Sequence, residues 1–255
     1  MKTLLASLIF TIVLFSGCSL SEQPQVKKLF QTNNATTTHD NYKNSLIQLL
    51  QYHKKLNLRN PTKYNPKTVR IIHNEIKYSN NNYFLFGTQT RQMRHYKDYL
   101  NLAFSKDDVR YRSDYLILGM YKLLYDTYSM HTSHKFTSLS YDFQKFHHAH
   151  KLMQVIQWKI KNDKDKYNNY LFKTWQNNWQ LELEKKIKQG VEPSWELIQK
   201  LKFIQNKQES IFDPSNNSFE LLSNNIIQNL KRDIKSMGQE PVDLATDALS
   251  FFIFL

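Results

Sequence analysis

Residues 140–161 read SYDFQKFHHAHKLMQVIQWKIK, the most regularly patterned stretch of this 255-residue chain. Its apolar side chains recur at intervals of three and four, at Phe146, Ala149, Met153, Ile156 and Ile160. This spacing places them on one face of an α-helix, because a helix turns once every 3.6 residues. We therefore predict an amphipathic helix that buries this face in a hydrophobic core.

Similar spacings on both sides of this stretch predict further helices. Asp40 is the expected N-cap of the first, and Pro66 sits where proline is favoured, in the first turn of a helix. The expected helices run from Asp40 to about Leu56, from Pro66 to about residue 79, within 84–104, from Ser105 to about Met130, from 140 to 161, from Leu171 to Ile187, from Pro193 to about Leu201, from Ser218 to Gly238, and from Pro241 onward.

These helices predict an all-α fold, a single globular bundle of about eight to ten helices over residues 40–255. The 40% content of hydrophobic residues in the whole chain is sufficient to fill a core. The sequence shows no glycine-rich phosphate loop, no alternating strand pattern and no internal repeat. We expect one domain, preceded by two short N-terminal segments.

The N-terminus has the pattern of an export signal. Lys2 precedes an apolar run over residues 4–15, and the small residues Ser16 and Gly17 lead into Cys18. This segment resembles the lipobox of bacterial lipoproteins, although Phe15 stands where that family prefers leucine. The resemblance implies cleavage after residue 17 and acylation of Cys18 by chains such as palmitate, which would anchor the protein in a membrane.

The residues after the cysteine suggest where the anchored protein resides. Residues 18–39 are polar and lack apolar periodicity, so we expect a flexible tether between lipid and domain. Ser19 occupies the position at which inner-membrane lipoproteins of enteric-type bacteria carry aspartate. The resemblance therefore implies an exported protein anchored in the outer membrane and facing the periplasm.

Charge and cysteine content limit the possible partners. The net charge is +13 at pH 7, and Cys18 is the only cysteine, so the chain can form no internal disulfide. The positive charge favours anionic cell-envelope polymers as partners. We expect no nucleic-acid partner, because export separates the protein from nucleic acid.

Two histidines of the helix expected over residues 140–161 are weak candidates for a metal site. His147 and His150 are three residues apart, a spacing that lets two side chains on a helix share a metal ion. The sequence contains no HExxH motif and no carboxylate inside this cluster. We therefore expect no metal and no cofactor, with these histidines in the core or on the surface.

Two tryptophans lie one turn apart in the ladder between residues 171 and 187. Trp175 and Trp179, with the polar side chains of Asn178 and Glu182 beside them, could form a face that stacks on sugar rings. The ladder continues in both directions, so the alternative is that both indoles lie in the core. Burial of both indoles would favour a role in the core over a sugar-binding face.

The chain ends in an apolar segment that allows two interpretations. A helix from Pro241 would carry Phe251, Phe252 and Phe254 near its end. The helix either docks on the bundle or leaves these side chains exposed as a surface for a partner. At about fourteen residues it is too short to span a bilayer.

No nucleophile motif is present, and the only cysteine is assigned to the lipid, so we do not expect an enzyme. The sequence favours a lipid-anchored, non-catalytic binding or assembly component that contacts another envelope protein. The alternative is a lipoprotein that binds or cleaves carbohydrate or peptidoglycan with the Trp175 and Trp179 face.

Overall fold

The computed structural model describes residues 23–59, 65–82, 93, 95–131, 142–174, 178–206 and 219–244. These residues form nine helices and no strand, which confirms the all-α fold class. The helices are α2 (Gln23–Arg59), α3 (Pro66–Lys77), α4 (Tyr96–Ala103), α5 (Arg112–Thr127), α6 (Phe143–Asn162), α7 (Asn178–Lys188), α8 (Trp195–Gln199), α9 (Lys202–Gln205) and α10 (Phe219–Ser236).

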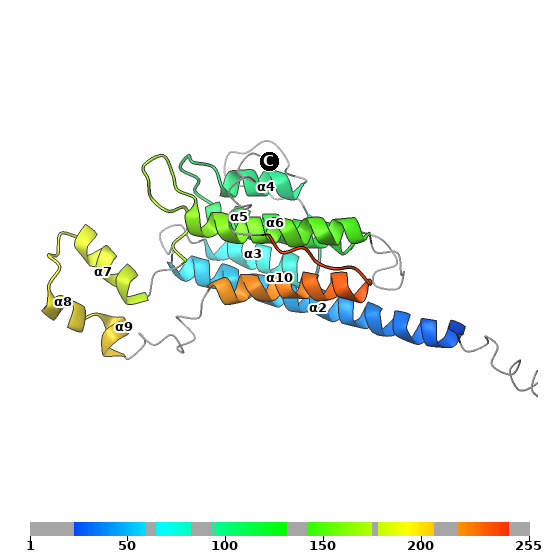
Figure 1. Ribbon diagram of the computed structural model, residues 1–255. Coiled ribbons are helices and arrows are strands. Elements are labelled where there is room, and N and C mark those ends of the chain that lie inside the picture. The colour runs from blue at the N-terminus through cyan, green and yellow to red at the C-terminus, as the bar shows by residue number, and fades with distance from the viewer. Residues whose placement is uncertain are drawn as a thin grey trace, which may run out of the picture.

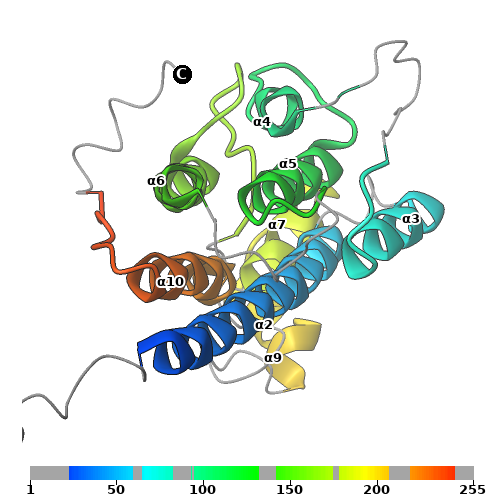
Figure 2. The ribbon, with the colours of Figure 1, turned by 90° about the vertical axis from the view of Figure 1, so that its right-hand side faces the viewer.

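Helix α5 lies at the centre of the bundle, with α2, α3, α4 and α6 packed around it (Figure 2). Every residue from Asp114 to Tyr125 is buried, as the sequence YLILGMYKLLY over residues 115–125 requires of a helix that is apolar on all sides. Helix α4 can approach α5 closely because Gly119 has no side chain. A Cβ at that position would lie only 2.7 Å from Leu100 Cδ2.

Helix α10 closes the bundle against α2 and α6, and its predicted apolar stripe is buried. Asn65 and Asp142 cap two helices, the first predicted to start at Pro66 and the second near residue 140. The side chain of Asn65 accepts hydrogen bonds from the N–H groups of Lys67 and Thr68, and Asp142 caps α6 by accepting from Gln144 N.

The expected tether over residues 18–39 is wrong from Gln23 onward, because α2 begins there and continues through the expected N-cap Asp40. Long-range polar packing stabilises this part of the helix. Thr38 and Asn41 are buried, and Asn41 Nδ2 donates a 2.6 Å hydrogen bond to Asp233 of α10. With 37 residues, α2 is roughly 55 Å long.

The predicted continuous helix from Leu171 to Ile187 is also wrong. Residues 163–174 form an irregular loop in which Lys164 and Tyr170 make an isolated β-bridge, and α7 covers Asn178–Lys188. Phe172 is fully buried and packs edge-on against Phe104 at 5.7 Å. In the predicted helix, Phe172 would lie on a different face from Leu171. The burial of Phe172 against Phe104 therefore disfavours that helix.

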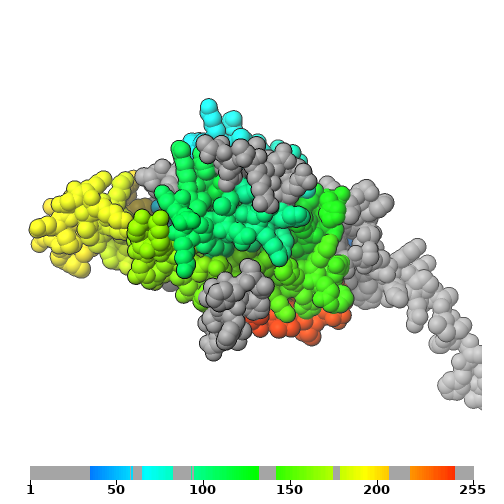
Figure 3. Space-filling view, turned by 90° about the horizontal axis from the view of Figure 1, so that it is seen from above, coloured from blue at the N-terminus to red at the C-terminus, as the bar shows by residue number. Residues whose placement is uncertain are grey.

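Helices α7, α8 and α9 project from one end of the bundle as a separate arm (Figures 1 and 3). They pack mainly on one another, and Leu201 between α8 and α9 is their one fully buried residue among those described. The structure therefore divides the expected single bundle into a six-helix body and this arm, which we call the distal arm.

The helix predicted to start at Pro241 is absent from residues 241–244, which have no regular secondary structure. This segment lies along α6: Leu244 N donates to Gln154 Oε1 at 2.9 Å, and Asp243 pairs with Lys231 of α10. Phe251, Phe252 and Phe254 lie outside the described residues. No helix in the described part of the chain has both the length and the apolar character needed to cross a membrane.

Candidate functional site

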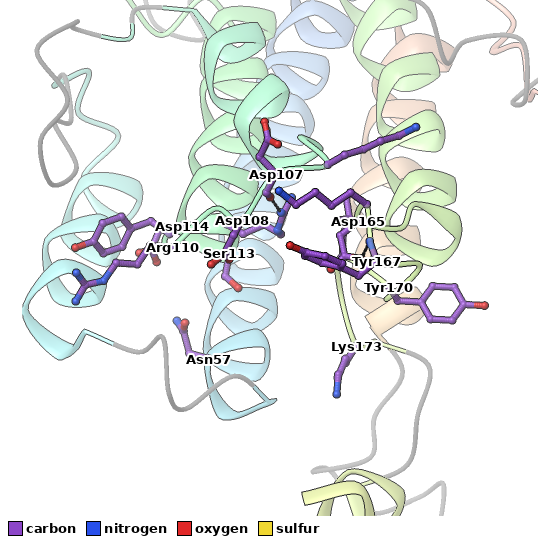
Figure 4. Close-up of a pocket in the computed structure, with 15 residues that line it drawn as sticks. Asn57, Asp107, Asp108, Arg110, Ser113, Asp114, Asp165, Tyr167, Tyr170 and Lys173 are labelled. Carbon is purple, nitrogen blue, oxygen red and sulfur yellow. Dashed lines mark hydrogen bonds between the residues drawn. The ribbon is translucent and has the colours of Figure 1, made fainter. Parts of the chain in front are cut away.

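A polar cavity of about 380 Å³ opens at the C-terminal end of α2, and we call it the distal cavity. Three segments far apart in the sequence line it: Asn57 of α2, residues between 106 and 114, and residues between 165 and 173. Figure 4 shows Asn57, Arg110 and Ser113 on one side and Tyr167 and Tyr170 on the other.

Arg112 holds in place the wall of the cavity that residues between 106 and 114 form. Its guanidinium donates to the carbonyl oxygens of Ala103 and Ser105, both at 2.7 Å, and of Asp107 at 2.6 Å. Burial lowers the pKa of Arg112, although the nearby carboxylates of residues 107, 108 and 165 oppose this effect. The side chain thus fixes the loop between α4 and α5 through three hydrogen bonds.

The opposite wall, formed by residues between 165 and 173, contains a tight turn organised by Asp165. Asp165 Oδ1 accepts from Tyr167 N at 2.8 Å and from Asn169 N at 2.9 Å, and these backbone hydrogen bonds hold the pKa of Asp165 below its usual value. The backbone N–H of Lys166 donates to the carbonyl oxygen of Lys106, which joins the two walls. Tyr167 consequently lies at the cavity rim with 72% of its surface exposed.

Buried polar groups lie beneath the cavity. His53 Nε2 is 2.8 Å from Asp114 Oδ1, and the His53 ring packs edge-on against His73 at 5.2 Å. Burial lowers the pKa of His73, with a further contribution from His53. Asn57 is buried as well, and its Nδ2 has no hydrogen-bond partner among the described residues.

The distal arm adjoins the cavity through Lys173. This lysine lines the cavity, its ammonium pairs with Glu184 of α7, and its carbonyl oxygen accepts from Arg59. The arm exposes three large apolar side chains: Trp195 is 69% exposed, and Ile187 and Val191 are each 42% exposed. Cavity and arm together form the end of the molecule opposite the start of α2 (Figure 1).

The structure describes only part of the predicted sugar-binding face. Trp179 is half-buried in α7, which begins at Asn178, whereas Trp175 and Cys18 lie outside the described residues. The Glu182 carboxylate accepts hydrogen bonds from the N–H groups of Lys202 and Phe203 at 3.0 and 3.2 Å. Glu182 therefore caps α9 instead of facing a ligand beside the indoles.

The histidines of α6 have separate surroundings. His150 is fully buried, its Nε2 lies 3.5 Å from Asp243 Oδ1, and burial lowers its pKa. His147 packs edge-on against Phe143, and His148 is 2.9 Å from the Tyr96 hydroxyl. Within the described ranges, no three histidine, cysteine or acidic side chains are grouped so as to hold a metal ion.

The distal cavity is not among the sites predicted from the sequence. Its residues come from the end of α2 and from two polar loops, 105–111 and 163–173, parts of which the sequence patterns assign to the helices expected from Ser105 and from Leu171. The one available signal was the density of charged and tyrosine residues in DDVRYRSD and DKDKYNNY. Comparison of the chain with protein-family models, curated proteins and solved structures found no match.

Proposed function

We propose that the protein is a lipid-anchored component of the cell envelope that acts by binding another envelope protein, without catalysing a reaction. The Gly17-Cys18 junction supports the anchor, and the net charge of +13 suits a compartment with anionic polymers. On this proposal the protein is held at the outer membrane and faces the periplasm.

The observation that carries the proposal is the distal arm. Three helices project from the body, bury little of their own surface and expose a tryptophan with two aliphatic side chains. Tryptophan is among the residues that contribute most to protein–protein binding, and exposed apolar groups that cluster on a projecting element favour a partner surface. An anchor before α2 would direct this arm away from the membrane (Figure 1).

The anchor is tested by replacing Cys18 with serine. We expect the variant to lose lipid labelling and to leave the membrane fraction, because the thiol that receives the acyl chains is absent. Metabolic labelling with a fatty acid and fractionation of the envelope measure both effects. A variant that stays in the membrane with its leader uncut would show that the leader itself is the anchor.

The arm is tested by photo-cross-linking in the native cell. A photoreactive residue at Val191 should give one discrete protein adduct. Adding Trp195→Ala should lower the yield of this adduct at least about fivefold, because a central aromatic side chain commonly contributes more than about 1 kcal/mol to protein–protein binding. The unfolding free energy should change by no more than about 0.5 kcal/mol, because Trp195 is exposed.

Tyr78 provides the matched control, since it is 64% exposed at the end of α3 on the body. A photoreactive residue at position 78 should give no discrete adduct, and Tyr78→Ala should leave the adduct at Val191 unchanged. Equal adducts at both positions, or an adduct at Val191 that survives Trp195→Ala, would contradict the proposal that the arm binds a specific protein.

A further inference from the structure

We infer that the distal cavity binds a small soluble ligand through an oxyanion, a carboxylate or a phosphate group. This site is separate from the surface of the distal arm and goes beyond the proposed protein-binding function. The cavity volume of about 380 Å³ lies within the range of small-molecule sites, roughly 300–1,000 Å³.

The N-terminus of α5 supplies the first part of the site. This 16-residue helix begins at Arg112, and its N-cap, Tyr111, makes no side-chain capping hydrogen bond. Its first residues, Arg112, Ser113 and Asp114, line the cavity. The backbone N–H groups at a helix start carry a partial positive charge and require acceptors, which an oxyanion provides.

Asn57 supplies an independent second observation. Its side chain comes from another helix, is only 8% exposed and lines the same cavity. Its Nδ2 has no hydrogen-bond partner in the described part of the structure, although buried amide donors in proteins are almost always paired. In Figure 4 its amide points toward the side of the cavity that carries Arg110 and Ser113. A bound oxyanion would accept from this donor.

The charges that remain available in the cavity are mainly positive. Lys106, Arg110 and Lys166 are exposed around it. Two of its four carboxylates are already engaged, since Asp114 pairs with His53 and Asp165 holds the turn before Tyr167. Asp108 is attracted by the Arg112 guanidinium, and the Asp107 carboxylate points away from Asn57 (Figure 4).

The position of the cavity favours a soluble ligand over a lipid headgroup. Asn57 lies 34 residues after Gln23 in the same helix, which places the cavity roughly 50 Å along α2 from its start. If the chain is anchored before α2, this distance exceeds the depth of the headgroup layer. We therefore expect a dissolved carboxylate or phosphate compound of the surrounding compartment.

Equilibrium dialysis of the full-length protein in a neutral detergent tests this inference. Inorganic phosphate and succinate are used in separate experiments as probes, with sodium chloride holding the ionic strength constant. We expect saturable binding of one anion per chain for at least one of them. The absence of saturable binding for both would overturn the inference, whatever the outcome for the distal arm.

Substitutions locate the binding. Asn57→Asp replaces the donor by a carboxylate of equal size and should weaken binding at least about tenfold, the effect of losing a hydrogen bond to a charged group. Lys166→Gln and Arg110→Gln alter exposed side chains that folding does not require, and each should weaken binding about threefold or more. They remain informative if Asn57→Asp folds poorly.

Lys235→Gln is the control, because it removes the same charge from an exposed position on α10 that does not line the cavity. Its affinity for either anion should match that of the unmodified protein. If Lys235→Gln weakens binding as much as Lys166→Gln, the anion is held by net charge alone and the inference fails.

Discussion

As the pH rises from 4 to 7, Asp233 is expected to lower the free energy of unfolding by about 4 kcal/mol, and replacing it with asparagine is expected to abolish this contribution. Asp233 is fully buried in α10, and burial raises its pKa to about 7, against 3.8 for an exposed aspartate. Hydrogen bonds from Asn41 Nδ2 and the Tyr128 hydroxyl lower the pKa but only partly offset the burial.

The sign follows from the protons bound in each state. Between pH 4 and pH 7 the folded protein keeps the proton on Asp233, whereas the unfolded chain has lost it. Folding therefore takes up a proton, so the free energy of unfolding falls as the pH rises and levels off above pH 7. The stated size follows from about 1.4 kcal/mol for each unit of pKa difference.

Urea unfolding of the two proteins across this pH range measures the effect. The half-buried His73 and the buried His150, whose pKa values are lowered, raise stability with pH in both proteins, so the difference between the proteins isolates Asp233. Glu192→Gln, at an exposed position, controls for the change in net charge. Parallel curves for Asp233→Asn and the unmodified protein would show that Asp233 does not carry the effect.

Lys122→Met is expected to destabilise the fold by about 3–5 kcal/mol, the usual cost of breaking a buried ion pair. Lys122 is 2% exposed in the central helix α5, and its ammonium lies 3.8 Å from Glu75 Oε1. It also donates to Asn81 Oδ1 at 2.7 Å and to Asn82 O at 2.8 Å. The substitution would leave the Glu75 carboxylate buried without its cation.

A double-mutant cycle tests this explanation. Glu75→Gln in the Lys122→Met background should recover part of the loss, because a neutral amide is easier to bury than an unpaired carboxylate. Lys77→Met, on the exposed face of α3, should change the free energy of unfolding by no more than about 0.5 kcal/mol. Additive effects at Lys122 and Glu75 would exclude the coupling proposed here.

Sequence patterns predicted the helices whose starts depend on adjacent residues. Asn65 and Asp142 cap α3 and α6 through hydrogen bonds to N–H groups two or three residues away, so a short window of sequence contained the necessary information. The part of α2 before Asp40 could not be found in this way. In the middle of this helix Asn41 bonds to Asp233, 192 residues later in the chain, and no local pattern reports such a partner.

The same limit applies to the candidate site. The Trp175 and Trp179 face requires an unbroken helix from Leu171, but residues 171–174 form a loop in which Phe172 is buried against Phe104. That loop forms one wall of the distal cavity. The cavity therefore depends on tertiary packing between three segments, which periodicity within a single segment cannot predict.

The length of α2 has a mechanical consequence. Cys18 lies only five residues before Gln23, so a lipid at that cysteine would hold one end of a helix roughly 55 Å long. A tilt of about 10° at the membrane would then move the far end by roughly 10 Å. Conversely, a partner that pulls on the distal arm would exert a torque on the anchor, so α2 would act as a lever between the bound partner and the membrane.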